Sequence, residues 1–260
     1  MMEAILPYLL TGVVSGILAG LLGIGGGLVI VPALVFLLAS DGTEHVMHIA
    51  IGTSLAVVAV TALSSTRAHH LKGTVRWPIW VRLSPGLFIG TLTGALVADQ
   101  LGGETLRLFF AVFELLVALH LMFKVQAKPV AQFPKAFVVF ALSFLIGIIC
   151  AFAGVGGGVM VVPLLIWLCI PIKEAISTSA ACGLPIAFAG TLGFMLTGWD
   201  MNTQLAAWST GYIYWPAFLG ISVTSVLFAP LGAKIAHALP ANVLRQVFAI
   251  FLLLLAILMF

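Results

Sequence analysis

A glycine-broken apolar segment that occurs twice constrains this chain more than any other feature. The two copies read GILAGLLGIGGGLVIVP, which ends at Pro32, and GIICAFAGVGGGVMVVP, which ends at Pro163. Glycine is a poor residue for a helix interior, so three in succession predict a break in each apolar helix. Broken helices at corresponding places in two halves of a membrane protein indicate a substrate-binding site.

The composition of the chain is typical of a protein that lies in a lipid bilayer. Its 260 residues are 62% hydrophobic and 7% charged, whereas about 25% of a soluble domain is charged. So few charges cannot cover a water-facing surface, and the apolar runs are long and continuous. We therefore expect an all-α polytopic membrane protein. The net charge of +3 does not indicate a nucleic-acid partner, because the cations lie in loops between apolar runs.

Eight apolar elements are expected, in two sets of four. The first set covers about 4–39, 46–66, 77–99 and 105–124, and the second covers about 135–170, 174–197, 206–236 and 241–260. Between the sets, the stretch KVQAKPVAQFPK is polar and basic and contains two prolines. The chain is therefore divided into a first membrane repeat, 1–124, a cytoplasmic linker, 125–134, and a second membrane repeat, 135–260.

Further matches extend the internal repeat beyond the glycine segment. The block AIGTS from Ala50 matches AISTS from Ala175. Near the ends of the halves, Gly94, Ala95, Leu101 and Arg107 recur as Gly232, Ala233, Leu239 and Arg245. Every element of one half thus has a partner in the other, which indicates duplication of a four-element unit.

The positions of the cations predict how the two halves are oriented. Arg67, Lys72 and Arg76 lie in the loop after the second element, and the linker between the halves is also basic. The positive-inside rule places both in the cytoplasm. The second-half counterpart of the first loop, GWDMNTQ, has one acid and no cation, so we expect it outside. Matching loops on opposite sides of the membrane indicate inverted repeats.

Inversion requires an odd number of membrane crossings per half, so one of the four elements must not cross. The first element is the candidate, because its length of about 36 residues would give about 54 Å of helix, against a hydrocarbon core of about 30 Å. A glycine-broken hairpin that enters and leaves by the same face satisfies both length and parity. This arrangement places both termini outside, with Lys173 and Lys234 inside and Asp41, Glu44, Asp99 and Asp200 outside.

The glycine breaks are the first candidate substrate ligands. They are Gly25, Gly26 and Gly27 in the first half and Gly156, Gly157 and Gly158 in the second. Irregular backbone at membrane depth is tolerated inside protein or beside a water-filled cavity. The free N–H groups at the start of each second half-helix would then favour an anion. The alternative is that these glycines only allow close helix packing, as we expect for Gly16.

A recurring pair of hydroxyl residues is the second candidate. Thr53 and Ser54 match Thr178 and Ser179, and each pair lies early in the element that follows a broken helix. Hydroxyl groups donate hydrogen bonds to an oxyanion without a fixed charge, which suits a protein that must also release its cargo. The alternative is that each hydroxyl bonds back to a carbonyl of its own helix.

Ionisable residues within or beside the apolar elements form a third group. Glu114 lies midway along the fourth element and is a candidate for proton coupling, the alternative being a buried acid bonded to a hydroxyl or to a partner subunit. Arg107 and Arg245 are expected to reach the membrane interfaces by snorkelling, with attraction of anions at each mouth as the alternative. We expect His48 in a solvated outer turn and His69 in the basic cytoplasmic loop.

The doubled motif resembles that of the TauE/SafE family of sulfite and organosulfonate exporters. The residues that carry this resemblance are GLLGIGGGLVIVP, AFAGVGGGVMVVP and the A-I-x-T-S block, and the similarity covers essentially the whole chain. Ala151 departs from it, because the first copy has Gly20 there. The resemblance implies a permease of the bacterial inner membrane that exports small sulfur-containing anions. It leaves the exact cargo open, since many members of the family have no known substrate.

The sequence therefore favours a secondary transporter for a small anion, working by alternating access at a site between two broken helices. The alternative is a structural or assembly subunit of a larger membrane complex. A membrane-embedded enzyme is disfavoured, because the chain has no HExxH or CxxC motif and no arrangement of serine, histidine and acid. No catalytic residue, metal or cofactor is expected. The expected partners are the anion and the lipid bilayer, and a homodimer is left open.

Overall fold

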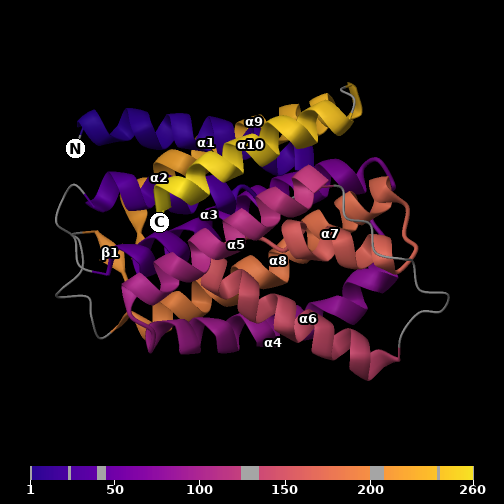
Figure 1. Ribbon diagram of the computed structural model, residues 1–260, viewed down its shortest axis with the longest axis horizontal. Coiled ribbons are helices and arrows are strands. Elements are labelled where there is room, and N and C mark those ends of the chain that lie inside the picture. The colour runs from indigo at the N-terminus through magenta and orange to yellow at the C-terminus, as the bar shows by residue number, and fades with distance from the viewer. Residues whose placement is uncertain are drawn as a thin grey trace.

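The structure is a computed structural model that describes residues 2–22, 25–39, 45–123, 135–199, 208–238 and 241–259. Within these residues the chain forms ten helices and one two-stranded antiparallel sheet (Figure 1). The elements are α1 (Met2–Leu22), α2 (Gly27–Ala39), α3 (Val46–His70), α4 (Trp77–Asp99), α5 (Gly103–Phe123), α6 (Ala136–Ala153), α7 (Gly158–Trp167), α8 (Ile172–Thr197), β1 (Ser209–Thr210), β2 (Ile213–Tyr214), α9 (Trp215–Ala238) and α10 (Ala241–Met259). The expectations for Asp41, Glu44, Asp200 and the linker 125–134 concern residues outside the described ones.

Five of the described helices are long and apolar enough to cross a bilayer, and the chain is an all-α polytopic membrane protein. The five spans are Val46–Leu71, Trp77–Asp99, Ala136–Ala153, Ile172–Thr197 and Trp215–Gly232. In contrast, α2 has 13 residues and α7 has 10. At 1.5 Å per residue these two helices are about 20 and about 15 Å long, so neither crosses a core of about 30 Å alone.

Both expected helix breaks are confirmed. In the first half, α1 ends at Leu22 and α2 begins at Gly27, and in the second half α6 ends at Ala153 and α7 begins at Gly158. Figure 1 shows that α1 starts at the end of the bundle that carries the N-terminus and that α2 runs back toward that end. The helices α6 and α7 form the corresponding hairpin from the opposite end (Figure 1).

The two halves of the chain pack by the same plan. Helix α1 lies along α9, and its counterpart α6 lies along α4. Likewise α3 contacts α9 as α8 contacts α4, while α3 packs on α8 and α5 on α10. Exchanging each helix for its counterpart in the other half therefore reproduces the main packing contacts of the bundle. The long helices α3 and α8 lie at the centre of this arrangement.

Small residues allow the outer helix pairs to approach closely. A Cβ atom on Gly16 of α1 would lie 2.5 Å from the carbonyl oxygen of Ser225 in α9. A Cβ atom on Gly147 of α6 would lie 2.6 Å from the carbonyl oxygen of Leu87 in α4. Any larger residue would separate these helices, so the packing role expected for Gly16 is confirmed.

One expected element is different in the structure. The apolar run 206–236 was expected to be a single helix, but β1 and β2 precede α9, which begins at Trp215. Ser209 pairs with Tyr214 and Thr210 with Ile213, and Gly211 in the turn between them has a φ of 55°. The β-branched and aromatic residues of this stretch favour a strand, and glycine supplies the positive φ of the turn. Hydropathy alone did not separate this hairpin from the helix.

Candidate functional site

The two helix breaks meet at the centre of the bundle. Gly25 and Gly26 have φ values of 80° and 79°, which residues with a Cβ atom rarely adopt. A Cβ atom on Gly25 would lie 3.4 Å from the Cα atom of Gly156, and one on Gly27 would collide with the carbonyl oxygen of Gly154. The breaks are therefore packed against each other, and glycine is required both for their backbone conformation and for their contact.

Each break leaves the start of a helix inside the protein. Helix α2 begins at Gly27 and α7 begins at Gly158. The first N–H groups of a helix have no intrahelical partner, and the helix dipole makes this end positive. Two such ends near the bundle centre create a region that is suited to negative charge without using a charged side chain.

A small cavity of about 10 Å³ lies beside the two breaks. It is large enough to hold about one water molecule. Gly25 and Gly156 line it from the breaks, Ala19 from α1, Thr61, Ala62 and Ser65 from α3, and Ala180 and Gly183 from α8. Two of the ten candidate ligands, Gly25 and Gly156, thus border this cavity. Gly26, Gly27, Gly157 and Gly158 belong to the same breaks but do not line it.

Two hydroxyl residues of α3 that sequence reasoning missed border the cavity. Thr61 is fully buried, donates a hydrogen bond to the carbonyl oxygen of Val57 at 2.9 Å, and lies 2.5 Å from the hydroxyl of Ser225 in α9. Ser65 is buried, and its hydroxyl has no hydrogen-bond partner among the described residues. Internal repetition does not point to Thr61 and Ser65, because the second half has no matching hydroxyls. Their four-residue spacing on one helix face was the available signal.

The predicted hydroxyl residues make contacts that hold the scaffold together. The N–H of Tyr214, just before α9, donates to the hydroxyl of Thr53 at 2.9 Å. The N–H of Arg76, just before α4, donates to the hydroxyl of Thr178 at the same distance. The two contacts are equivalent: a threonine of α3 binds the segment before α9, and the matching threonine of α8 binds the segment before α4. A substrate-binding role for Thr53 and Thr178 stays a prediction.

Ser54 and Ser179 follow these threonines and are also fully buried. Ser54 donates a hydrogen bond to the carbonyl oxygen of Gly154 at 2.8 Å, which ties α3 to the second break. The hydroxyl of Ser179 has no partner among the described residues. The first-half match of Gly154 is Gly23, which lies outside the described residues. The hydroxyl block is thus connected to the breaks, although neither serine lines the small cavity.

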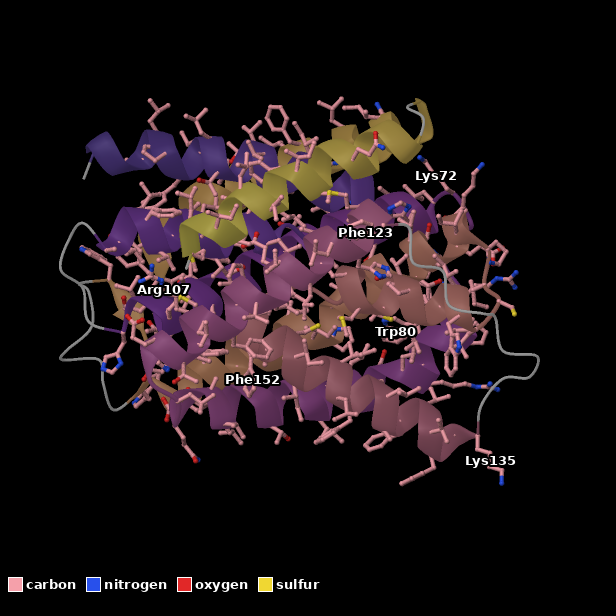
Figure 2. All side chains as sticks on the ribbon, viewed as in Figure 1. Lys72, Trp80, Arg107, Phe123, Lys135 and Phe152 are labelled. Atoms are coloured by element: carbon pink, nitrogen blue, oxygen red, sulfur yellow. The ribbon has the colours of Figure 1, made fainter. Side chains whose placement is uncertain are left out.

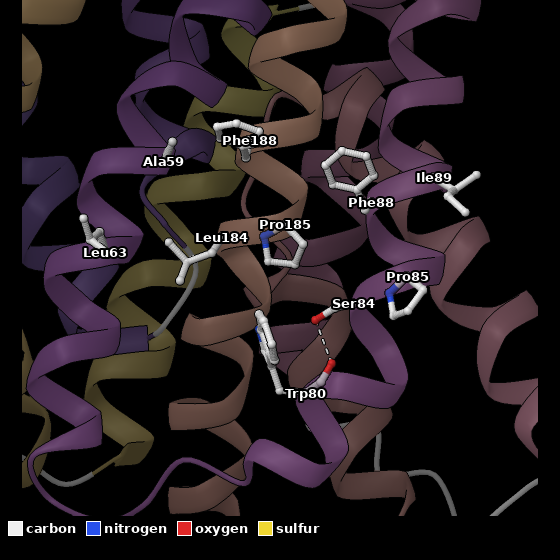
Figure 3. Close-up of a pocket in the computed structure, with 10 residues that line it drawn as sticks. All are labelled: Ala59, Leu63, Trp80, Ser84, Pro85, Phe88, Ile89, Leu184, Pro185 and Phe188. Carbon is white, nitrogen blue, oxygen red and sulfur yellow. Dashed lines mark hydrogen bonds between the residues drawn. The ribbon is translucent and has the colours of Figure 1, made fainter.

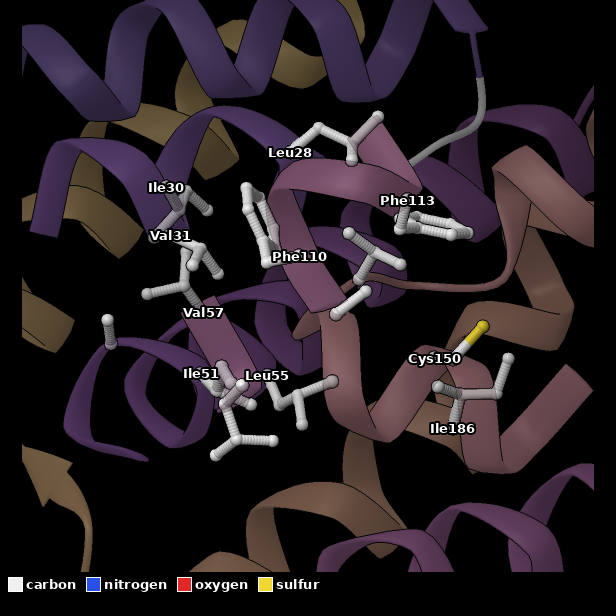
Figure 4. Close-up of a cluster of buried hydrophobic side chains, with 14 of the residues drawn as sticks. Leu28, Ile30, Val31, Ile51, Leu55, Val57, Phe110, Phe113, Cys150 and Ile186 are labelled. Atoms are coloured by element: carbon white, nitrogen blue, oxygen red, sulfur yellow. The ribbon is translucent and has the colours of Figure 1, made fainter. Parts of the chain in front are cut away.

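Glu114 lies in a different part of the protein. Its side chain on α5 is fully buried, and neither carboxyl oxygen has a hydrogen-bond partner among the described residues. Phe110 and Phe113 of the same helix pack in an apolar cluster with residues of α2, α3, α6 and α8 (Figure 4). The carboxyl group does not border the cavity at the breaks. Any coupling between Glu114 and that cavity would therefore act through the helices between them.

At each end of the bundle a polar side-chain contact joins neighbouring elements. At one end the Arg76 guanidinium donates to the Glu174 carboxylate at 2.6 and 3.0 Å, and this contact raises the pKa of Arg76. At the other end the Tyr212 hydroxyl donates to Asp99 at 3.0 Å. Burial raises the pKa of Tyr212 and the contact with Asp99 adds to the effect, so the hydroxyl remains a donor at neutral pH.

For three other charged or titratable residues, the observed position can be compared with the one expected from the sequence. Arg107 donates from Nε to the carbonyl oxygen of Met259 at 2.8 Å, so it joins α5 to the last turn of α10. His48 is buried rather than in a solvated turn, with Nε2 3.1 Å from the carbonyl oxygens of Ala98 and Leu101 at the end of α4. His69 is buried in the last turn of α3 rather than in the loop. Nothing can be added for the side chain of Arg245, which lies outside the described ones.

A larger apolar groove of about 740 Å³ lies on the outside of α3, α4 and α8 (Figure 3). Leu63 and Phe188 on its walls are exposed. The indole N–H of Trp80 donates to the carbonyl oxygen of Ala181 at 2.9 Å. Pro185 has no N–H to donate to that carbonyl, so the indole replaces the missing helical hydrogen bond. The groove is suited to contact with lipid chains and offers little to a small anion.

The fold and the site define the chain as a membrane transporter with two broken helices that meet at its centre. The chain belongs to the family described as "Sulfite exporter TauE/SafE", whose model matches residues 8–259. The resemblance seen in the sequence is therefore confirmed. Members of this family and the relatives described next are membrane transporters rather than enzymes.

Curated relatives share most of the length of the chain. A probable membrane transporter protein of Haemophilus influenzae is 38% identical over 265 residues, which cover 100% of this chain and 99% of the relative. The probable membrane transporter protein YunE of Bacillus subtilis is 32% identical over 72% of this chain and 77% of its own length. A probable membrane transporter protein of Methanocaldococcus jannaschii is 27% identical over 93% of this chain and 90% of its own. Because the relatives are named as membrane transporters and five described helices are long enough to cross a bilayer, the chain is a multi-pass bacterial membrane protein. No solved structure matches the chain.

Proposed function

We propose that this protein is a secondary transporter that exports a small sulfur-containing anion, such as sulfite or an organosulfonate. One observation carries the proposal: the breaks before α2 and α7 pack against each other beside a cavity bordered by hydroxyls. No charged side chain borders this cavity in the described part of the chain. Backbone N–H groups and hydroxyls bind an anion by hydrogen bonds alone, so the anion is held without a permanent counter-ion and can be released.

The inverted arrangement of the halves, 1–124 and 135–260, is part of the same proposal. It is supported by the exchange of helix contacts between halves and by the opposite directions of the two hairpins (Figure 1). In inverted-repeat transporters, one repeat rocks against the other around a site at mid-membrane. The cavity has room for about one water molecule, which fits a resting state of such a cycle in which no cargo is bound. The basic end of α3, α4, α6 and α8 would face the cytoplasm.

The class of cargo rests on the family description and on the chemistry of the site. The family description names sulfite. Sulfite and sulfonates present oxygen atoms that accept several hydrogen bonds at once, which matches a site that consists of donors. A cation would require oxygen ligands with negative charge or several carbonyl groups turned inward.

Glu114 is the candidate for proton coupling within this proposal. Ionisable residues inside membrane segments often carry protons in transporters. Its carboxyl group is buried and has no partner among the described residues, which supports a role in proton transfer over one in a salt bridge. Because Glu114 does not border the cavity, it would affect transport through the position of α5 and not by contact with the cargo.

Flux in proteoliposomes tests the proposed function. Vesicles that contain the purified protein are loaded with radiolabelled sulfite, taurine or sulfate, and the release of each label is compared with that from protein-free vesicles. The proposal predicts faster release of at least one sulfur anion and saturation as its concentration rises. If all three labels leave at the protein-free rate, and flux of a cation is observed instead, the anion proposal is wrong.

A further inference from the structure

The internal repeat relates two sides of the breaks to each other, and the cavity lies on only one of them. The match of AIGTS with AISTS makes Ile186 the counterpart of Thr61, Leu55 the counterpart of Ala180, and Val58 the counterpart of Gly183. In each of these three pairs the residue that borders the cavity is smaller or more polar than its counterpart. The paired contacts of Thr53 and Thr178 support this alignment of α3 with α8.

The corresponding space on the other side of the breaks is filled. A Cβ atom on Gly157 would lie 2.7 Å from Cδ1 of Ile186, and one on Gly190 would lie 2.6 Å from Cδ1 of Leu55. Figure 4 shows Leu55 and Ile186 in one apolar cluster with Cys150, the counterpart of Ala19. One side of the breaks is therefore small and polar, whereas the equivalent side is apolar and tightly packed.

The polar side continues along α3 toward the basic end of the bundle. Thr61, Ser65 and His69 follow each other at intervals of four residues, so they lie on one face of the helix. All three are buried. The equivalent positions on α8 are Ile186, Gly190 and Phe194, which carry no polar side chain. We call the face with Thr61, Ser65 and His69 the polar face of α3.

A group of hydrogen bonds closes the basic end of the polar face. Nδ1 of His69 lies 3.2 Å from the hydroxyl of Ser177 in α8, and that hydroxyl lies 2.7 Å from the hydroxyl of Thr74. Thr74 in turn donates to the carbonyl oxygen of His69 at 3.2 Å. These contacts join α3, α8 and the segment before α4 at the point where the polar face reaches the surface.

Positively charged side chains surround the contact of Ser177 with His69 and Thr74. Lys72 lies in the turn just after α3, and Lys173 lies one turn before Ser177 on α8. Both side chains are exposed (Figure 2 shows Lys72 at this end of the bundle). Arg76 is also there, paired with Glu174. A cluster of cations at the mouth of a polar route raises the local concentration of anions.

We infer that the cargo anion moves between the central cavity and the basic end along the polar face of α3, and that the contact of Ser177 with His69 and Thr74 closes this route. The inference rests on the proposed function, because it assigns further cargo-contacting residues to the same transporter. Thr61 and Ser65 contact the anion next to the breaks, and His69 and Ser177 contact it near the surface. The route on the opposite side is closed by Ile186, Leu55 and Phe194 in this structure.

Thiol labelling tests the route without knowledge of the cargo. Ser65→Cys is introduced into a background in which Cys150, Cys169 and Cys182 are replaced by alanine, and a small anionic methanethiosulfonate is added to sealed vesicles of either orientation. Lys72→Cys marks the basic end, because its side chain is exposed there. We expect Ser65→Cys to be labelled from the same side as Lys72→Cys.

Opening of the contact is tested in the same background with Ser177→Ala, and with Thr74→Val as an independent second variant. Each should label Ser65→Cys about tenfold faster, the effect expected when one hydrogen bond that stabilises a closed state is lost. The matched control is Lys135→Cys, which is exposed at the same end of the bundle and outside the contact, and whose labelling rate should not change. Labelling of Ser65→Cys from the opposite side, or equal rates with and without Ser177→Ala and Thr74→Val, would overturn the inference. Since labelling needs no cargo, this failure is separate from failure of the flux experiment.

Discussion

The hydroxyl of Ser54 donates a hydrogen bond to the carbonyl oxygen of Gly154 at 2.8 Å, although the two residues are 100 positions apart in the chain. This contact joins the hydroxyl block of the first half to the helix break of the second. Gly154 ends α6 with a φ of 63°, a conformation that leaves its carbonyl outside the helix. The hydrogen bond therefore fixes the position of a break relative to the central helix α3.

Replacement of Ser54 by alanine tests the contribution of this contact. The change leaves a buried carbonyl without its partner, which should lower the free energy of unfolding by about 1–3 kcal/mol. Thermal unfolding in detergent measures the effect. Ser84→Ala is the control, because Ser84 only donates to the carbonyl oxygen of Trp80 in its own helix. Equal destabilisation by the two variants would mean that the contact with Gly154 has no special role.

The backbone requirement at the first break is tested by Gly26→Ala. A Cβ atom there would lie 2.9 Å from the carbonyl oxygen of Ser15, and the φ of 79° is unfavourable for alanine. Gly73→Ala is the matched control, because Gly73 has a φ of 68° but no atom within 4 Å of an added Cβ. The control should cost about 1–2 kcal/mol for the left-handed conformation alone. We expect Gly26→Ala to lower stability further and to reduce transport, and a smaller loss than in the control would contradict the close packing of this break.

The role of Trp80 is tested by a double-mutant cycle with Pro185. Trp80→Phe removes the hydrogen bond to the carbonyl oxygen of Ala181, at a cost of about 1–3 kcal/mol for an unsatisfied buried group. In a Pro185→Ala background, the alanine N–H can satisfy that carbonyl, so Trp80→Phe should cost less. Thermal unfolding of the four proteins gives the coupling. Costs that simply add would show that the indole does not replace the helical hydrogen bond.

Proton coupling by Glu114 predicts a change in pH dependence. Transport by the unaltered protein should vary with pH, because the carboxyl group must gain and lose a proton in each cycle. Glu114→Gln keeps the shape of the side chain but cannot titrate, so its transport rate should vary less with pH than that of the unaltered protein. Glu174→Gln at the exposed ion pair is the control and should retain the original profile. A pH profile that is the same in Glu114→Gln as in the unaltered protein would leave Glu114 with a structural role.

Much of the fold could be predicted from hydropathy and internal repetition. The range 77–99 predicted for α4 agrees with the helix Trp77–Asp99, and both glycine breaks were expected at the residues where the helices end. The hairpin before α9 could not be predicted in this way, because hydropathy does not distinguish two short strands from the first turns of a helix. The burial of His48 and His69 depends on contacts with α4 and α8, which are distant in the sequence.

The candidate site could be predicted less completely, because only part of it recurs in both halves of the chain. Residues that recur in both halves led to Gly25 and Gly156, which do border the cavity. The same criterion passed over Thr61 and Ser65, because their counterparts are Ile186 and Gly190. Residues that match between the halves make matching scaffold contacts, as Thr53 and Thr178 do. The residues that distinguish the two sides of the breaks lie at positions where the two halves carry different amino acids.

Binding of a panel of anions to the purified protein tests the central claim most directly. The panel consists of sulfite, sulfate, thiosulfate, sulfoacetate, taurine and acetate, with a change of cation as the control, and binding is measured as thermal stabilisation. An anion present at about 100 times its dissociation constant should stabilise the protein by about 2.7 kcal/mol. The account predicts selective stabilisation by one or more of the sulfur anions. Stabilisation by none of them, or a response that follows the cation and not the anion, would contradict an anion site between the helix breaks.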